Sequence, residues 1–155
     1  SNYETPGDAL AEVLGDALFA CPGRALRSLI AARAPVHAYQ FDYPKAPFQL
    51  PTSIDLGAYH AAEVQFVFQH PAELFATDFE GEALLLSNEL MDRWTRFAAT
   101  RDPNIEGAAT WPPFDEAGEA HLIVDVPSVE SANAKKEVCA FWEGIDYLRA
   151  PLGEP

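Results

Sequence analysis

The stretch VHAYQFDY, at residues 36–43, constrains the fold of this chain more than any other feature. Successive side chains of an extended strand point to opposite faces, so His37, Tyr39, Phe41 and Tyr43 share one face, while smaller residues occupy the other. A predominantly apolar strand of this kind is typical of a sheet that helices cover on both sides. The sequence therefore predicts an interior strand with helical layers above and below it.

Two helices are predicted before this strand. The first runs from Asp8, its N-cap, to Ala20, with one apolar stripe at helical spacing: Leu10, Val13, Leu14, Ala17 and Leu18. The second starts near Pro22, which suits a first helical turn, and ends near Arg33. Its expected inward residues are Leu26, Leu29 and Ile30. The order helix, helix, strand favours an α/β architecture over a β-sandwich.

A long loop, residues 44–59, is predicted after the strand because prolines recur in it. The apolar segment Ala61 to Phe68 is too short for its type to be assigned. A strong helix follows from Glu82 to Thr100 and ends before Pro103. Its expected inward residues are Leu84, Asn88, Met91, Trp94, Phe97 and Ala98.

The last part of the chain is predicted to hold a loop, a short strand and a final helix. The loop covers residues 104–119, and the strand HLIVDV covers His121 to Val126. The helix is expected from Ala134 to Leu148. Its inward residues should be Val138, Phe141, Trp142 and Ile145. The sequence shows no internal repeat and no domain linker.

Charge and composition exclude several classes of function. The net charge is −14, from 24 acidic and 10 basic residues, which argues against nucleic-acid binding and favours a solvated acidic surface. The sequence contains no run of 18 or more apolar residues, so no membrane span is expected. No HExxH, HxxxH or CxxC spacing is present, so we expect no metal site, and no motif predicts a bound cofactor.

His60 is the candidate for chemistry because it ends the long loop after the strand, where α/β enzymes place reactive groups. From the pattern alone, a loop histidine is more often structural or simply solvated. His37, His70 and His121 have weaker contexts. No G-x-S-x-G sequence occurs, and Ser1, Ser28 and Ser53 lack the setting of a nucleophile elbow. Composition also leaves open whether Cys21 and Cys139 are buried thiols or a bridge.

Taken in order, several segments resemble the C-terminal region of type-B carboxylesterases, the cholinesterase-like family. The resemblance covers nearly the whole chain at compatible spacing. Its segments are FACPGRAL (19–26), VHAYQFDY (36–43), GAYHAAEVQFVF (57–68), LSNELMDRWTRFAATRDPN (86–104), Trp111 to Phe114, and CAFWEGI (139–145). The family often has Gly after its histidine, where this chain has Ala61. Because a small residue replaces a small one, this departure does not put catalysis in doubt.

This resemblance implies that residues 1–155 are the C-terminal segment of a single α/β-hydrolase catalytic domain, with the last strands of its central sheet and covering helices. The nucleophile-bearing N-terminal portion would be absent, and we expect the segment not to fold stably alone. His60 would be the general base of a Ser–acid–His triad. Glu63 matches a family position that would support the loop from behind, and it is not expected to be the triad acid.

The implied function is carboxylic ester hydrolysis through an acyl-enzyme, with no cofactor. The substrate would be a small ester, and the implied partner is the upstream portion of the same gene product, carrying the serine and the acid. The family also implies a Cys21–Cys139 disulfide, which would place the protein in a secreted or periplasmic setting. In the chain-entropy model, whose mechanism is disputed, such a bridge contributes about 4–5 kcal/mol.

Two alternatives remain at this stage. Some cholinesterase-like domains keep the fold but have lost the serine, and act as adhesion or hormone-precursor modules. Retention of His60 favours the enzyme, and an upstream G-x-S-x-G would discriminate the two. An unrelated acidic binding domain is the third reading.

Overall fold

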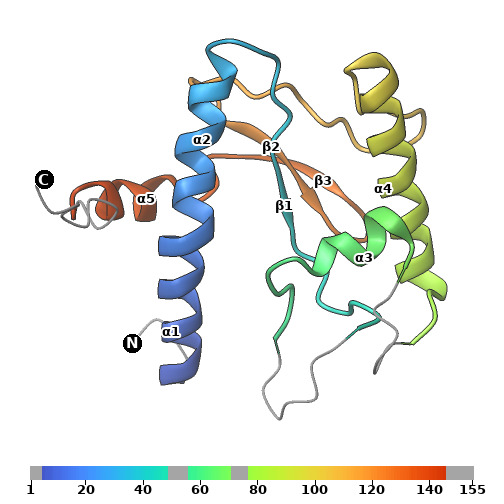
Figure 1. Cartoon of the computed structure of the whole chain (residues 1–155), viewed down its shortest axis with the longest axis horizontal. Coiled ribbons are helices and arrows are strands. Elements are labelled where there is room, and N and C mark those ends of the chain that lie inside the picture. Colours follow the sequence, from blue (N-terminus) through green and yellow to red (C-terminus); the bar gives the residue numbers. More distant parts are fainter. Residues whose placement is uncertain (1–4, 49–55, 71–76, 146–155) are drawn as a thin grey trace, which may run out of the picture. The chain divides into compact units, whose positions relative to one another are not determined.

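The structure, a computed structural model, describes residues 5–48, 56–70 and 77–145. They form two compact units (Figure 1). The helical unit combines Ser1–Ala34 with Asn133–Pro155, and the sheet unit is Pro35–Ala132. Among the described residues, no helix has the length and apolar character needed to cross a membrane.

The first helix, α1 (Pro6–Gly15), begins earlier than predicted because Thr5, not Asp8, is its N-cap. The Thr5 hydroxyl accepts a hydrogen bond from the Asp8 backbone N–H at 3.2 Å. In return, the Asp8 carboxylate accepts from the Thr5 backbone N–H at 2.8 Å. This reciprocal pair is a capping box with an Asp at its third helical position.

The two predicted N-terminal helices are continuous. A π-helical turn, η1 (Asp16–Ala20), leads directly from α1 into α2 (Cys21–Ala31). Pro22 lies in the first turn of α2, as predicted. Because proline has no N–H to donate to the preceding turn, the wider π turn lies where the hydrogen-bond register of the helix changes.

The last helix, α5 (Lys136–Glu143), is joined to the N-terminal helices by a disulfide and an ion pair. Cys21 and Cys139 are bridged across 118 positions, as the family resemblance implied. The Lys135 ammonium lies 2.5 Å from a Glu12 carboxylate oxygen and 3.0 Å from an Asp16 oxygen. Burial lowers the pKa of Lys135, but the bonds to both carboxylates outweigh it, so the pKa is raised. The part of the predicted helix at 146–148 lies outside the described residues.

The apolar stripes of the helical unit are exposed, contrary to prediction. Leu29 is 64% exposed and Phe141 is 63% exposed, and the same correction applies to other predicted inward residues: Leu26, Ile30, Val138 and Ile145. The leucines and the valine of the first predicted stripe are exposed as well: Leu10, Val13, Leu14 and Leu18. The buried positions of these helices are Asp16, Ala17, Cys21 and Cys139. Helical periodicity therefore indicated which residues share a face, but the described residues of the helical unit do not themselves cover that face.

The sheet unit contains a three-stranded sheet in the order β1-β2-β3. β1 (Tyr39–Phe41) runs parallel to β2 (Ala120–Val124), with Tyr39 opposite Leu122. β3 (Val129–Ala132) is antiparallel to β2. β1 is shorter than the predicted strand 36–43, but flanking residues extend its bonding, since Asp42 donates to Val124. β3 was not predicted because its sequence, VESA, carries no apolar alternation.

The predicted aromatic face of residues 36–43 is confirmed. Phe41 and Tyr43 pack on Phe66, with ring centroids 5.2 and 5.6 Å apart. Tyr39 and His37 both contact the ring of Trp111. Ala38, on the opposite face, is also buried.

Two helices cover this aromatic face. The segment whose type the sequence left open is a helix, α3 (Ala62–Phe68), and the strong helix is confirmed as α4 (Gly81–Thr100). The buried side of α4 differs from the predicted stripe: it is Ala83, Leu86, Ser87, Leu90 and Arg93, while Leu84, Asn88, Phe97 and Ala98 are exposed. Ser87 can be buried because its hydroxyl donates to the Phe66 carbonyl at 2.8 Å.

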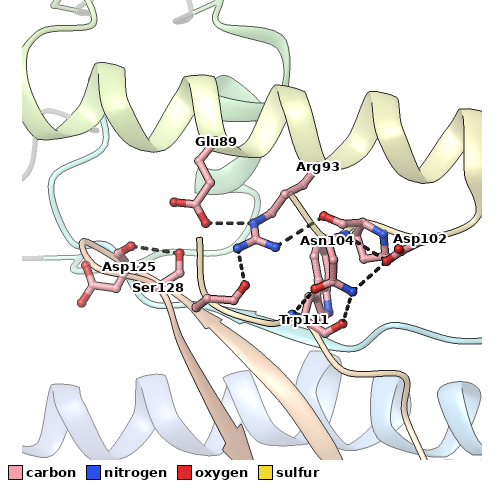
Figure 2. A network of polar contacts seen from close by, with 9 residues as sticks. Glu89, Arg93, Asp102, Asn104, Trp111, Asp125 and Ser128 are labelled. Atoms are coloured by element: carbon pink, nitrogen blue, oxygen red, sulfur yellow. Dashed lines mark hydrogen bonds and ion pairs between the residues drawn. The ribbon is translucent and has the colours of Figure 1, made fainter. Parts of the chain in front are cut away.

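Arg93 is fully buried and connects α4 to the loop that follows it (Figure 2). Its Nε donates to Glu89 at 2.8 Å, and its Nη2 donates to the Ala109 carbonyl at 2.7 Å. Nη1 reaches the Pro103 carbonyl at 3.4 Å. A buried guanidinium is tolerated only when it is paired and hydrogen-bonded, so these contacts determine the path of the loop.

The first half of the same loop is also fastened to the sheet. Asn104 accepts from the Trp111 backbone N–H at 2.7 Å and donates to its carbonyl at 3.1 Å (Figure 2). The Trp111 indole N–H donates to the Ala38 carbonyl at 2.7 Å. Loop 104–119 therefore packs closely against β1, although it has no regular structure.

We expect reduction of the Cys21–Cys139 disulfide to release α5. The bridge and the Lys135 ion pair hold this helix, and its apolar side chains are exposed. A Cys21→Ser/Cys139→Ser variant of the complete protein should lose about 2–5 kcal/mol of unfolding free energy, measured in urea. Limited proteolysis should then cleave within Lys136–Glu143 first. Unchanged protease resistance of this segment would contradict the expectation.

Candidate functional site

His60 is exposed and lies in the turn that leads into α3. The backbone N–H of Ala62 donates to the Tyr59 carbonyl at 3.0 Å, which closes the turn around His60 and Ala61. Ala62 is fully buried at the start of the helix. The main chain on the C-terminal side of His60 is therefore anchored in the core, while the imidazole is presented at the surface.

Ala61 explains why a glycine suits the position after the histidine. Its φ is 66° and its ψ is 12°, which is left-handed backbone. L-amino-acid residues adopt this conformation at a cost of about 1–2 kcal/mol, which the achiral glycine avoids. Size alone, on which the sequence argument relied, is therefore not the whole reason: this turn requires a positive φ, and the alanine is strained in it.

Glu63 lies in the first turn of α3 and reaches β1. Its carboxylate accepts a hydrogen bond from the Tyr39 hydroxyl at 3.4 Å. Burial, the charge of Glu63 and this hydrogen bond raise the pKa of Tyr39 to about 12. Glu63 therefore joins the His60 segment to the sheet.

The other predicted residues are distributed across the molecule. His37 packs against Trp111, and the buried His121 points its Nδ1 at the Glu119 carbonyl. Cys21 and Cys139 belong to the helical unit, whereas His60 belongs to the sheet unit. Ser28 donates to the Arg24 carbonyl within α2, as a helical serine does, and Ser1 and Ser53 lie outside the described residues.

The described ranges can be compared with the needs of a metal site and of a small-molecule pocket. No group of three or more His, Cys, Asp or Glu side chains there could hold a metal ion. A pocket of about 670 Å³ is lined by polar residues, among them Lys45, Asp78 and Glu80. None of the predicted site residues lines it.

Sequence reasoning missed three residues that contact the His60 segment: Tyr39, Tyr59 and Gln65. Tyr39 was assigned to the aromatic face, but nothing in the alternation indicated that its hydroxyl reaches Glu63. Tyr59 and Gln65 bond to each other at 2.6 Å. A polar side chain within a short apolar segment was the only signal for Gln65.

Comparison with known proteins identifies relatives across most of the chain. Residues 1–142 match the carboxylesterase family. The chain is 32% identical to an acylcarnitine hydrolase of Mus musculus over 131 residues, covering 84% of the chain and 23% of that protein. It is 34% identical to an acetylcholinesterase of Gallus gallus, covering 87% of the chain and 18% of that protein.

Solved structures agree with this assignment. A PNB esterase superposes with a TM-score of 0.67 at 28% identity, over 82% of the chain and 25% of that structure. A thermophilic PNB esterase gives a TM-score of 0.65 at 27% identity, over 83% of the chain and 26% of that structure. The predicted fold class, the C-terminal part of an α/β-hydrolase fold, is confirmed, and the chain spans about a quarter of these relatives.

We expect Glu63→Gln to lower the pKa of Tyr39 below about 12 while leaving it above its ordinary value of 10.0. A nearby carboxylate disfavours the tyrosinate anion, so removing the charge lowers the pKa, but burial, the largest cause, remains. The absorbance of tyrosinate near 295 nm measures the titration, and Tyr39→Phe identifies which transition belongs to Tyr39. An unchanged transition in Glu63→Gln would show that the two side chains do not interact.

Proposed function

Because the chain belongs to the carboxylesterase family, we propose that the protein that carries it is a carboxylic ester hydrolase with His60 as its general base. The observation that carries this proposal is the position of His60. His60 is the one histidine of the family segment GAYHAAEVQFVF, and it is exposed in a turn. The helix that follows this turn begins at Ala62, which is buried. Such a turn presents an imidazole in a defined place without burying it.

In this mechanism His60 moves one proton in each half-reaction. It accepts the proton of the serine Oγ as the oxygen bonds to the acyl carbon, and it returns that proton to the alcohol as the ester C–O bond breaks. Water then repeats the sequence on the acyl-enzyme: His60 takes a proton from the water and gives it to the departing serine. The serine and the triad acid are supplied by the remainder of the domain, and no cofactor takes part.

In this proposal Glu63 supports the position of His60 without touching the substrate. Its contact with Tyr39 joins the first turn of α3 to β1. Together with Phe66, which packs on Phe41 and Tyr43, it restricts how the helix can slide along the strand. The His60 turn at the start of the helix is restricted with it.

The proposed partner is the upstream portion of the same gene product, so that residues 1–155 form one segment of a single catalytic domain. Two observations support it. β1 has a strand neighbour on one side only among the described residues, although its aromatic character is that of an interior strand. The helices also expose apolar side chains such as Leu29 and Leu26, a surface that soluble proteins normally cover.

A secreted or periplasmic setting is part of the same proposal. The Cys21–Cys139 disulfide supports it, because structural disulfides persist in oxidising compartments and are rare in the cytosol of mesophiles.

We expect His60→Ala in the complete protein to lower kcat/KM for ester hydrolysis at least about a thousandfold, the scale of losing one triad member. The matched control is His70→Ala, another exposed loop histidine just beyond α3, which should leave activity within about twofold. Hydrolysis of p-nitrophenyl acetate provides the measurement. Activity of His60→Ala within about tenfold of the parent would assign the base to another residue.

The isolated 155-residue chain is expected to show no esterase activity and a poorly cooperative thermal melt, because its apolar faces and its strand edge are uncovered. The complete polypeptide should carry G-x-S-x-G upstream and should hydrolyse esters. A complete polypeptide without that serine would instead be the non-catalytic cholinesterase-like module. Full activity and cooperative unfolding of the isolated chain would refute the partner proposal.

A further inference from the structure

A compact polar cluster, formed by Phe48, Tyr59 and Gln65, holds the residue that precedes His60. The Tyr59 hydroxyl donates to the Phe48 carbonyl at 2.7 Å, and the Gln65 side-chain amide donates to the Tyr59 hydroxyl at 2.6 Å. The Phe48 backbone N–H donates to the Gln65 amide oxygen at 2.7 Å. These three residues are called the clamp below.

The chemistry of the clamp leaves little freedom. The Phe48 N–H needs an acceptor, so the oxygen of the Gln65 amide must face it and the NH₂ group must face Tyr59. The Tyr59 hydroxyl then accepts from Gln65 and donates to Phe48, which uses its one proton. Burial raises the pKa of the Tyr59 hydroxyl, while the hydrogen bond from Gln65 opposes that shift, so the group stays a donor at neutral pH.

Both supports of the clamp are themselves anchored. Gln65 is buried on α3, next to Phe66, which is fully buried in the core. On the other side, the carbonyl of Pro47, adjacent to Phe48, accepts from the Thr77 backbone N–H at 3.1 Å. The clamp therefore ties Tyr59 both to α3 and to the segment around Pro47 and Phe48.

Tyr59 is held by its main chain as well as by its side chain. Its carbonyl accepts the hydrogen bond from Ala62 that closes the turn. His60 therefore lies between Tyr59, which the clamp holds, and the strained left-handed Ala61. A turn that contains a strained residue persists only where its surroundings over-determine it, and the clamp supplies that constraint.

We propose that Tyr59 and Gln65 are positioning residues for the general base. Through the clamp they fix the main chain of the His60 turn, so the imidazole is already placed beside the serine before each reaction begins. This inference rests on the proposed function of His60. A displacement of about 1 Å in a catalytic group can cost on the order of a hundredfold in rate. Because the clamp does not touch the ester, its loss should act on kcat rather than on KM.

The test is pre-steady-state hydrolysis of p-nitrophenyl acetate by the complete protein. With enzyme in excess, the release of p-nitrophenol measures acylation, which His60 assists, and the thermal melt of each variant reports whether its fold is intact. Tyr59→Phe should lower the acylation rate by about 10–100-fold, with a cooperative thermal melt like that of the parent and KM within about threefold. Gln65→Met should have a similar effect, and the double variant should be no slower than the worse single variant, because both disrupt one unit.

The matched control is Tyr43→Phe. Tyr43 packs on the same Phe66 ring, and its hydroxyl takes no part in the clamp, so this variant should acylate within about twofold of the parent. Wild-type acylation by Tyr59→Phe, or additive losses in the double variant, would overturn the proposal. Loss of the cooperative melt in both single variants would assign the clamp to folding alone and would overturn it equally.

His60→Ala, measured in the same series, separates the two levels of inference. If His60→Ala still acylates at the parent rate, the function proposed for His60 is wrong. If His60→Ala is inactive while Tyr59→Phe acylates normally, His60 is the base and only the positioning role is wrong.

Discussion

The packing of the aromatic face of residues 36–43 determines where the rest of the sheet unit lies. Phe66 of α3 packs against Phe41 and Tyr43. Trp111, from the loop after α4, packs against His37 on the same face. Aromatic pairs of this kind add about 0.5–1.5 kcal/mol each beyond the area they bury. Because α3 follows the His60 turn directly, the same contacts that build the core also place the candidate base.

The buried polar groups set the details that apolar periodicity could not predict. For α4, the sequence predicted the helix and its end, but not which side is buried, because LLL at 84–86 fits more than one phase. The choice depends on Ser87 and Arg93, which a hydrophobicity pattern assigns to solvent. Both are buried because partners exist that are remote in sequence: the Phe66 carbonyl for Ser87, and the Pro103 and Ala109 carbonyls for Arg93. Sequence spacing carries no record of such partners.

The helical unit shows the opposite case, in which periodicity was correct and burial was not. The residues of α2 expected to face inward do share one side, yet Leu26 and Leu29 are exposed. A stripe predicts that a surface is to be covered and says nothing about what covers it. Under the partner proposal, the upstream portion covers this surface; the chain spans about a quarter of the length of its relatives. β3 and the π turn were missed for a simpler reason, because neither has a periodic apolar signature.

In the candidate site, too, the sequence predicted one residue and missed the residues that hold it. The candidate base His60 could be identified from a run of family residues, because the reaction proposed for it needs an imidazole at that point in the chain. The residues that hold it could not be identified so, since a hydroxyl and an amide satisfy backbone groups wherever geometry allows. Ala61 shows why these holding residues are needed. A glycine would adopt the φ of 66° without cost, but it would also give the unfolded chain more conformational freedom at this position. An alanine restricts the turn at the cost of strain, and that strain is stable only while Tyr59 is fixed on one side and Ala62 on the other. The identity of the residue after the histidine and the presence of a polar clamp before it are therefore two parts of one constraint on the same main-chain turn.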